Sequence, residues 1–302
     1  MNQYQEIFSK VTKIIKKHGI PSYVKKWKVQ TAKDNYITLN DFIIDLNEYV
    51  KKYHHHTLIF YKNRFVPSRQ QLDLLLKHKK LPYYTDKPRR LPYMTIDKNK
   101  IGYIRFYQYY NYENKNKHNE WIKFSMYVKN KLDYWETTGL KGLIIDFRYH
   151  YGGSAWPIYY ALSHFFEGST LFAWTNCKAK HKDKVWMNVQ NGNPISNQRF
   201  ISKKLNVYFP IAIIIGKNTT SSGEVGAVMF YGRDNVKFFG QRTYGSLSGN
   251  IDFQINDKIE LVVTTSLINT VNGEFLQEQF IRPDKKTNSP ILDAKKWIIS
   301  KL

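Results

Sequence analysis

A run of small hydroxyl residues lies where one element of the chain must turn into the next. Thr219-Thr220-Ser221-Ser222-Gly223 follows the apolar run Ile211–Ile215 and precedes a helical pattern. A serine at a strand-to-helix turn can act as an exposed nucleophile, with helix N-terminal N–H groups beside it to stabilise an oxyanion. The same residues also suit a turn that ends in an N-cap serine. The turn is not a G-x-S-x-G elbow, so the residues alone leave both interpretations open.

Three histidines in a row form a second candidate. His54, His55 and His56 precede the apolar run that begins at Thr57. The pKa of histidine lies near neutrality, which suits a general base for a serine. A surface turn after a helix, able to bind a metal ion adventitiously, is the simpler interpretation of the triplet taken by itself.

Two nucleotide-binding patterns fail. A phosphate loop would need Gly at position 211 and Ser or Thr at position 218, where the chain has Ile211 and Asn218. The segment RYHYGG at 148–153 lacks the G-x-G-x-x-G of a dinucleotide loop. The sequence therefore argues against nucleotide binding.

Composition limits the size of the fold, the cysteine chemistry and the kinds of partner. The 302 residues are 42% hydrophobic, enough for one large globular domain or two small ones. A single cysteine, Cys177, excludes a disulfide framework and a cysteine-based zinc site. The net charge of +23 favours an anionic partner such as a membrane surface. The lysines are spread along the chain without an RNA-module signature, so no specific nucleic acid is expected.

The first 55 residues are expected to be mostly helical. Apolar residues at helical spacing predict helices within residues 1–55, the second with a capping box from Thr38 to Asp41. A strand is predicted near residue 101, and a helix over 119–137.

The rest of the chain has an alternating α/β pattern. Continuous apolar runs at 142–147, 211–215 and 236–240 are typical of strands covered on both faces, and the first two are each followed by a turn and a helix. Residues 170–205 are interpreted as a polar segment that interrupts the α/β pattern. A hairpin over 253–266, turning at Asn256-Asp257, and a final helix from Pro290 complete the pattern.

Three segments carry a resemblance to a known family. They read GLIIDFRYHYGG (142–153), NTTSSGEVGAVMF (218–230) and FFGQRTYGSLSGN (238–250), in that order. Together they resemble the D-x-R-x-N-x-G-G, [ST]-x-S-[AS]-[AGS]-E and G-x-x-T-x-G turns of the tail-specific (C-terminal processing) serine peptidases. Within that family the chain is most similar to the nisin resistance protein type, which shares the S-S-G-E turn and the late R-P-D.

The resemblance implies an α/β fold: a tail-specific-protease-like core with a mixed sheet and flanking helices, and an N-terminal helical portion. Residues 1–95 would form the N-terminal helical or cap portion that carries the base, and 96–302 the α/β peptidase core. No PDZ domain is expected, because too few residues separate His56 from the strand near 101.

The resemblance also implies roles for the serine turn. The family nucleophile stands three residues before a glutamate, which identifies Ser221 ahead of Glu224. The backbone N–H of Ser222 and that of Gly152 or Gly153 would form the oxyanion hole. Glu224 itself is expected to be a structural or helix N-terminal charge.

The expected catalytic base differs from that of the processing proteases. Ser246 stands where they carry a catalytic lysine, so a Ser–Lys dyad is excluded at that position. The nisin resistance type takes its base from a histidine followed by Ser or Thr in the N-terminal part, which implies His56, with His54 and His55 as its competitors. His150 replaces the usual asparagine beside the oxyanion turn.

Four residues are expected to bind substrate: His150, Asn250, Trp156 and Tyr244. Trp156 and Tyr244 suit core or helix-packing positions equally well. No third catalytic acid, no metal and no cofactor is expected.

The implied function is a serine endopeptidase of the C-terminal processing type. It would cleave a small peptide near its C-terminus, a lantibiotic, with Ser221 and His56 as a dyad. The net charge argues against a cationic lantibiotic as a tightly held substrate. A peptidase with an unrelated protein substrate and a non-catalytic peptide-binding member are the alternatives. The expected location is membrane-associated or extracellular if an anchor was trimmed, and cytoplasmic if the chain is complete as written.

Overall fold

The structure is a computed structural model that describes residues 2–33, 35–62, 64–67, 91–109, 117–176, 184–191, 193–196, 207–273, 276 and 279–302. The described residues fall into two compact units. The smaller unit takes those within Met1–Lys87, Asn176–Asp183 and Ser248–Leu267, and the larger unit those within Pro88–Thr175, Lys184–Leu247 and Ile268–Leu302. The predicted boundary between residues 95 and 96 stays a prediction, and Cys177 lies outside the described residues.

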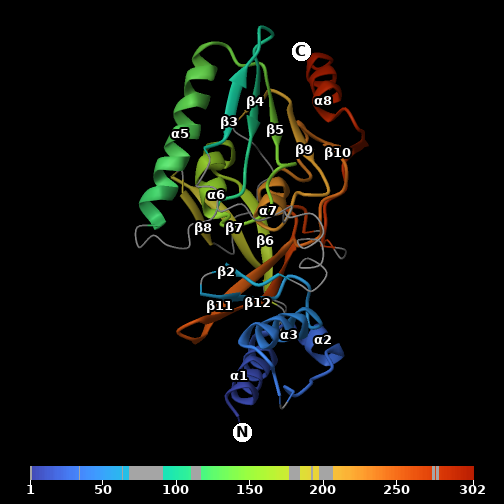
Figure 1. The fold of residues 1–302 in the computed structure, drawn as a ribbon. Coiled ribbons are helices and arrows are strands. Elements are labelled where there is room, and N and C mark those ends of the chain that lie inside the picture. The colour runs from blue at the N-terminus through green and yellow to red at the C-terminus, as the bar shows by residue number, and fades with distance from the viewer. Residues whose placement is uncertain are drawn as a thin grey trace. The chain divides into compact units, whose positions relative to one another are not determined.

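The larger unit is built on a sheet in the order β13-β10-β9-β5-β4-β3 (Figure 1). Neighbouring strands from β13 to β4 run parallel, and β3 pairs antiparallel with β4. Its elements are β3 (Tyr93–Ile96), β4 (Ile101–Arg105), α5 (Lys117–Thr137), β5 (Gly142–Asp146), α6 (Trp156–Leu162), η1 (Ser163–Phe166), β9 (Ile211–Ile215), α7 (Ser222–Val228), β10 (Val236–Gly240), β13 (Lys285–Lys286) and α8 (Pro290–Ile299).

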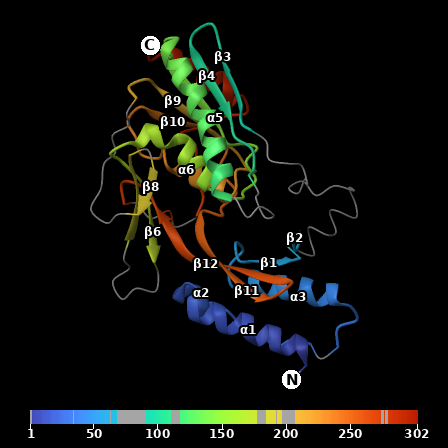
Figure 2. The same cartoon turned by 90° about the vertical axis from the view of Figure 1, so that its left-hand side faces the viewer.

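Helices cover both faces of this sheet. On β9, Ile211 and Ile213 pack in the apolar cluster that includes residues of α5, α6 and α7, whereas Ala212 and Ile214 pack with residues of α8. Figure 2 shows α5 and α8 on opposite sides of the strands. Alternate residues of a strand point to opposite faces, so a strand buried on both faces must be apolar throughout. Strands occur at all three predicted positions. β5 and β9 are buried along their whole length, whereas Val236 and Lys237 of β10 are half-buried.

Three antiparallel strands occur within residues 170–205, which the sequence predicts only as a polar segment. β6 (Thr170–Asn176), β7 (Lys184–Gln190) and β8 (Asn193–Ser196) pair in sequence, and β6 neighbours the end of β12 (Ile259–Asn269). The sequence missed them because several of their buried positions are polar. Thr170 donates its hydroxyl to Asn188 Oδ1 at 2.6 Å, and both side chains are fully buried.

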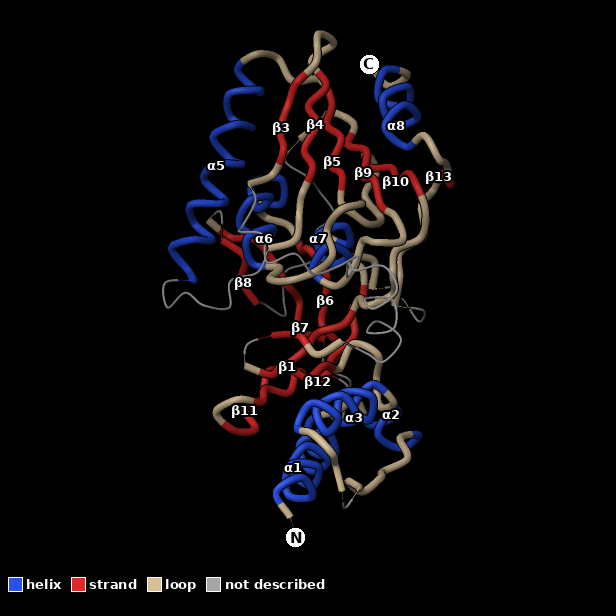
Figure 3. The backbone as a smooth tube through the Cα atoms, viewed as in Figure 1, coloured by secondary structure: helices blue, strands red, loops and turns tan. Residues whose placement is uncertain are grey.

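The smaller unit packs helices on a short antiparallel sheet (Figure 3). Its elements are α1 (Gln3–His18), α2 (Pro21–Lys26), α3 (Leu39–Lys51), β1 (Leu58–Tyr61), β2 (Arg64–Phe65), β11 (Ser248–Asn256) and most of β12. β1 and β11 both pair antiparallel with β12. One apolar cluster joins the buried faces of α1 and α3 to β1, β11 and β12.

Several predicted elements of the sequence are found. The capping box between Thr38 and Asp41 opens α3, and the hairpin of β11 and β12 turns after Asn256. The last helix, α8, begins at Pro290 after Ser289. Among the described residues no helix is long and apolar enough to cross a membrane.

Candidate active site

Ser221 occupies a strained position at the start of α7. Its backbone angles are φ 53° and ψ −116°, in a region that residues other than glycine rarely adopt. Such a conformation costs on the order of 1–3 kcal/mol and persists only where surrounding contacts enforce it. The residue is half-buried and lies between β9 and α7. We call residues 217–224 the Ser221 turn.

Glu224 holds this turn through backbone hydrogen bonds. Its Oε2 accepts the N–H of Ser221 at 2.9 Å and that of Ser246 at 2.7 Å, and its Oε1 accepts the N–H of Gly245 at 2.8 Å. The carboxyl group is fully buried. Burial raises the pKa of Glu224 to about 7, although these hydrogen bonds and one from Thr243 act to lower it. Glu224 therefore ties the Ser221 turn to the loop that follows β10.

A second turn, residues 147–153, lies against the Ser221 turn, and we call it the Gly-Gly turn. Thr220 donates its N–H to His150 O at 3.1 Å, and Thr219 donates its hydroxyl to Phe147 O at 3.0 Å. A Cβ on Gly223 would lie 2.8 Å from His150 O and 2.9 Å from its ring Nδ1. Only glycine permits this approach, so the small residues of the two turns fit each other.

The start of the Gly-Gly turn is fixed by an ion pair. Asp146 is fully buried at the end of β5 and accepts two hydrogen bonds from the Arg148 guanidinium, at 3.0 and 2.7 Å. It also accepts the hydroxyl of Tyr103 at 2.6 Å. A bidentate pair of this kind adds geometric specificity. It explains the D-x-R part of the sequence pattern as an anchor for the turn.

Two backbone N–H groups at these turns are available to a ligand. Among the described residues, neither the N–H of Ser222 nor that of Gly153 has a hydrogen-bond acceptor. Gly152 donates its N–H to His150 Nδ1 at 3.3 Å. Gly152 and Gly153 both have φ 108°, and a Cβ on Gly153 would overlap Tyr109 O at 2.1 Å. Of the two glycines, Gly153 is therefore the one whose N–H has no acceptor among the described residues.

His150, in the Gly-Gly turn, has its ring buried against the Ser221 turn and not at the surface. It is fully buried, and burial lowers its pKa to about 3, so the ring is neutral. Its Nδ1 accepts from Gly152, while its Nε2 has no hydrogen-bond partner within the described residues. The buried ring therefore packs against the position of Gly223 in the Ser221 turn.

His56 lies in the smaller unit, within a group of buried polar side chains. Its Nδ1 is 2.7 Å from Ser248 Oγ, and its Nε2 is 3.3 Å from Asn250 Nδ2. Because the Asn250 amide nitrogen can only donate, Nε2 is the accepting nitrogen and Nδ1–H donates to Ser248. Burial, and secondarily His55, lowers the pKa of His56 to about 3. We call His54, His56, Ser248, Asn250 and Thr264 the His56 cluster.

The three adjacent histidines have different surroundings. His54 is buried, and its Nδ1 accepts the N–H of His56 at 3.2 Å and lies 3.1 Å from Thr264 Oγ1. His55 is exposed and stacks on His54 with ring centroids 4.5 Å apart. His54 and His56 thus each place Nδ1 against a buried hydroxyl, and His56 differs in that its Nε2 also contacts the Asn250 amide.

The other expected substrate residues are spread over both units. Asn250 contacts His56, and its Oδ1 accepts the Thr264 hydroxyl at 3.0 Å. Trp156 is 41% exposed at the start of α6 and stacks on Trp121. Tyr244 is 53% exposed, and its N–H donates to Thr219 O at 2.9 Å, which places it beside the Ser221 turn.

Sequence reasoning did not identify Ser248 or Thr264 as members of the site. Ser248 lies 192 residues from His56 in the chain, so no spacing rule could link them. Among the described residues there is no group of three His, Cys, Asp or Glu side chains placed to hold a metal ion.

Comparison with known proteins gives consistent matches. Residues 100–287, well over half of the chain, match the model of Peptidase family S41. The nisin-resistance protein of Lactococcus lactis subsp. lactis is 32% identical over 169 residues, which cover 53% of this chain and 51% of that protein. The carboxy-terminal processing protease CtpA of Bacillus subtilis (strain 168) is 24% identical over 163 residues, 54% of this chain and 32% of that protein. The matches therefore span about half or less of these relatives' lengths.

Solved structures share the fold. A lipoprotein from Streptococcus agalactiae has a TM-score of 0.71 at 23% identity, with 100% of this chain and 98% of that chain covered. The photosystem II D1 C-terminal processing protease has a TM-score of 0.57 at 10% identity, with 100% and 97% covered. The expected α/β fold class is confirmed.

Proposed function

The chain belongs to peptidase family S41, and on that premise we propose that it is a serine peptidase with Ser221 as nucleophile and His56 as general base. His56 Nε2 takes the proton of the Ser221 hydroxyl as Oγ attacks the carbonyl carbon of the scissile peptide bond. The C–N bond then breaks, and Nε2 returns the proton to the leaving amine. Water, activated by the same imidazole, hydrolyses the acyl-enzyme and regenerates Ser221.

The oxyanion of the tetrahedral intermediate would be held by backbone. The N–H groups of Ser222 and Gly153 have no acceptor within the described part of the chain, so they can donate to developing charge without breaking an existing bond. In both positions the turn geometry is set by neighbouring contacts before any substrate binds. Preorganised donors of this kind stabilise a transition state more than a ground state.

The observation that carries the proposal is the backbone of Ser221. Ser221 is a non-glycine residue with φ 53° and ψ −116°, six positions after the end of a buried parallel strand and immediately before a helix. A nucleophile elbow likewise holds its serine in a strained strand-to-helix turn. Ser221 is also the N-cap of α7, with Glu224 as its capping-box partner. Capping alone does not require a positive φ, because N-caps ordinarily have extended angles. Strain enforced by Glu224 at this one residue favours a catalytic serine over a simple cap.

Two residues that lie close together in the chain, Ser246 and Ser248, support the pairing of Ser221 with His56. Ser246 donates its N–H to Glu224, which holds Ser221, and the hydroxyl of Ser248 bonds to His56. Only Leu247 separates Ser246 from Ser248 in the sequence.

For the substrate we propose a small peptide cleaved near its C-terminus, and a lantibiotic in particular. The support is the relatives' names: one is a nisin-resistance protein and another a carboxy-terminal processing protease. A protein that acts on such peptides beside an anionic membrane would benefit from a basic surface.

One observation favours a second function, a peptide-binding member without catalysis. His56 Nε2, the atom that must take the serine proton, contacts the Asn250 amide at 3.3 Å. Ser246 also replaces the lysine base of the processing proteases. In this alternative the turns bind a peptide and no bond is cleaved.

The test is mass spectrometry of a lantibiotic panel incubated with the parent protein and with Ser221→Ala. We expect C-terminal fragments with the parent, and a loss of about 10³-fold or more in rate with Ser221→Ala. Ser300→Ala, at an exposed serine near the C-terminus, is the matched control and should keep the parent's rate. Cleavage by all three proteins would reject Ser221 as nucleophile. Binding by all three without cleavage would establish the peptide-binding alternative.

A further inference from the structure

His150 is joined to both turns of the candidate site. Its main-chain oxygen accepts the N–H of Thr220, in the Ser221 turn, at 3.1 Å. Its ring Nδ1 accepts the N–H of Gly152, in the Gly-Gly turn, at 3.3 Å. The side chain is fully buried. One residue thus contacts the Ser221 turn through its backbone and the Gly-Gly turn through its imidazole.

The two glycines of the Gly-Gly turn need contacts that fix their backbone. Gly152 and Gly153 both have φ 108°, and glycine is the residue with the widest range of backbone angles. After the glycines, Ser154 donates its N–H to Tyr109 O at 2.9 Å. Before them, the hydrogen bond from Gly152 to the His150 ring limits rotation. The direction of the Gly153 N–H therefore depends on His150 as well as on Tyr109.

The hydrogen bond from Gly152 to His150 spans two positions in the chain. Asparagine side chains form the same contact in turns, where the amide oxygen accepts the N–H of the residue two positions on. An imidazole nitrogen can accept only if it carries no proton, so the neutral ring bears its proton on Nε2. His150 Nδ1 therefore supplies the acceptor that an asparagine would supply at this position.

The His150 ring also lies against Gly223, in the Ser221 turn. A Cβ on Gly223 would lie 2.9 Å from both His150 Cβ and His150 Nδ1, closer than real side chains approach. Gly223 follows Ser222, and Gly152 precedes Gly153, so the imidazole contacts a neighbour of each proposed oxyanion donor. Because protein interiors are close-packed, a ring fixed in this position limits how near the two turns can come.

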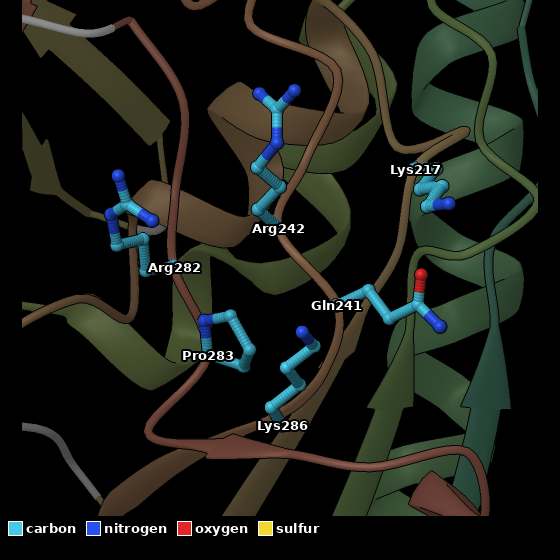
Figure 4. Close-up of a pocket in the computed structure, with 6 residues that line it drawn as sticks. All are labelled: Lys217, Gln241, Arg242, Arg282, Pro283 and Lys286. Carbon is cyan, nitrogen blue, oxygen red and sulfur yellow. The ribbon is translucent and has the colours of Figure 1, made fainter.

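The pocket beside the Ser221 turn does not include this ring. The pocket has a volume of about 460 Å³ and is lined by Lys217, Gln241, Arg242, Arg282, Pro283 and Lys286 (Figure 4). His150 is not among these lining residues, and its side chain has no exposed surface. A buried ring that contacts two glycines is suited to act through them and not by touching a ligand.

We propose that His150 is a positioning residue of the peptidase reaction: its ring holds the N–H groups of Gly153 and Ser222 at the separation and in the direction that the oxyanion requires. The proposal rests on the proposed function, in which these two groups stabilise the tetrahedral intermediate. An oxyanion hole acts through donors that are in place before charge develops. A displacement of about 1 Å can cost about 10²-fold in rate, so a small shift of the Gly-Gly turn is enough to matter.

Steady-state kinetics on one cleaved peptide tests the proposal with two substitutions. His150→Leu has a similar volume but no acceptor, and should lower kcat by about 10–100-fold with KM unchanged. His150→Asn restores an acceptor two positions before Gly152 and should recover most of the loss. His164→Leu, at a half-buried histidine of η1 in the same unit, is the control and should keep the parent's kcat. Thermal melting confirms that each variant is folded, and His150→Ala takes the place of His150→Leu if the leucine variant does not fold.

The kinetics can overturn the proposal in three ways. An unchanged kcat in His150→Leu would mean that the ring does not position the donors. An equal loss in His150→Asn would mean that the acceptor has no part in the effect. A rise in KM with kcat unchanged would place His150 in substrate binding instead.

Amide exchange gives a second measurement that needs no activity. In protein isotope-labelled at the glycine nitrogens and followed by NMR, the Gly152 N–H should exchange about fivefold more slowly in the parent and in His150→Asn than in His150→Leu. Equal exchange in all three proteins would overturn the proposal. If the parent cleaves no peptide, the proposed function fails, and the exchange difference alone decides whether His150 fixes the Gly-Gly turn.

Discussion

The Ser221 turn of the larger unit and the His56 cluster of the smaller unit are held in place by different kinds of contact. At the Ser221 turn, Glu224 accepts backbone N–H groups, so the geometry depends on one carboxyl group and on the path of the chain. In the His56 cluster, side chains contact other side chains: Ser248 and Asn250 on the imidazole, and Thr264 on Asn250. Single substitutions should therefore affect the two regions differently.

The largest expected effect separates His56 from its neighbour. His56→Ala removes the proposed base and should lower kcat/KM for peptide cleavage by about 10²–10⁴-fold, or about 3–5 kcal/mol of transition-state stabilisation. His55→Ala, at an exposed ring one position away, should stay near the parent's value. Steady-state kinetics on one cleaved peptide measures both. If His55→Ala loses the activity and His56→Ala keeps it, the base is assigned to the wrong histidine.

This contrast also explains what the sequence could predict. The Ser221 turn follows a continuous apolar strand and precedes a helix, so its place in the fold was readable from local pattern, and the match to family S41 confirms the resemblance drawn from its motifs. Ser248 could not be found, because its contact with His56 depends on the pairing of β1 and β11 with β12. The strands β6 and β7 were missed because Thr170 and Asn188 bury polar groups against each other.

Lowering the pH should destabilise the His56 cluster more than the Ser221 turn. Burial lowers the pKa of His54 and of His56 to about 3, so each binds its proton in the unfolded chain between pH 6.5 and about 3 and stability falls as the pH falls. A single pKa unit at each of these two residues corresponds to about 3 kcal/mol. Near the Ser221 turn, His150 also lowers stability as the pH falls, because burial lowers its pKa. Glu224 has the opposite effect: its pKa is raised to about 7, so it gains a proton in the folded state and stabilises the fold as the pH falls from 7 to 4.5.

Hydrogen exchange measured by mass spectrometry at pH 7 and pH 5, corrected for intrinsic rates, checks this difference. We expect peptides that contain residues 54–57 to lose protection at pH 5 more than peptides that contain residues 217–224. Equal losses in both segments would show that the two regions respond to acid as one.

Glu224→Gln should disturb the Ser221 turn by a smaller amount. The glutamine amide must set its NH2 group against at least one of the three backbone donors, from Ser221, Gly245 and Ser246, and leave that donor unpaired. A buried unpaired donor costs about 1–3 kcal/mol of unfolding free energy. Urea unfolding measures the cost. Glu120→Gln, on α5, is the control and should change stability by less than about 0.5 kcal/mol. Unchanged stability in Glu224→Gln would mean that the carboxyl group does not hold the turn.

The smallest expected effect concerns the support of His56 by Ser248. Ser248→Ala removes the acceptor of Nδ1–H, so the imidazole loses one hydrogen bond that fixes its ring and stabilises its protonated form during catalysis. One such bond is worth about 1 kcal/mol, which predicts about a fivefold fall in kcat with KM unchanged. Ser248→Thr keeps a hydroxyl and should recover most of the loss, whereas Ser266→Ala, on the paired strand β12, should have no effect. A rise in KM with kcat unchanged would instead place Ser248 in substrate binding, and the side-chain contacts of the His56 cluster would then not be part of the catalytic step.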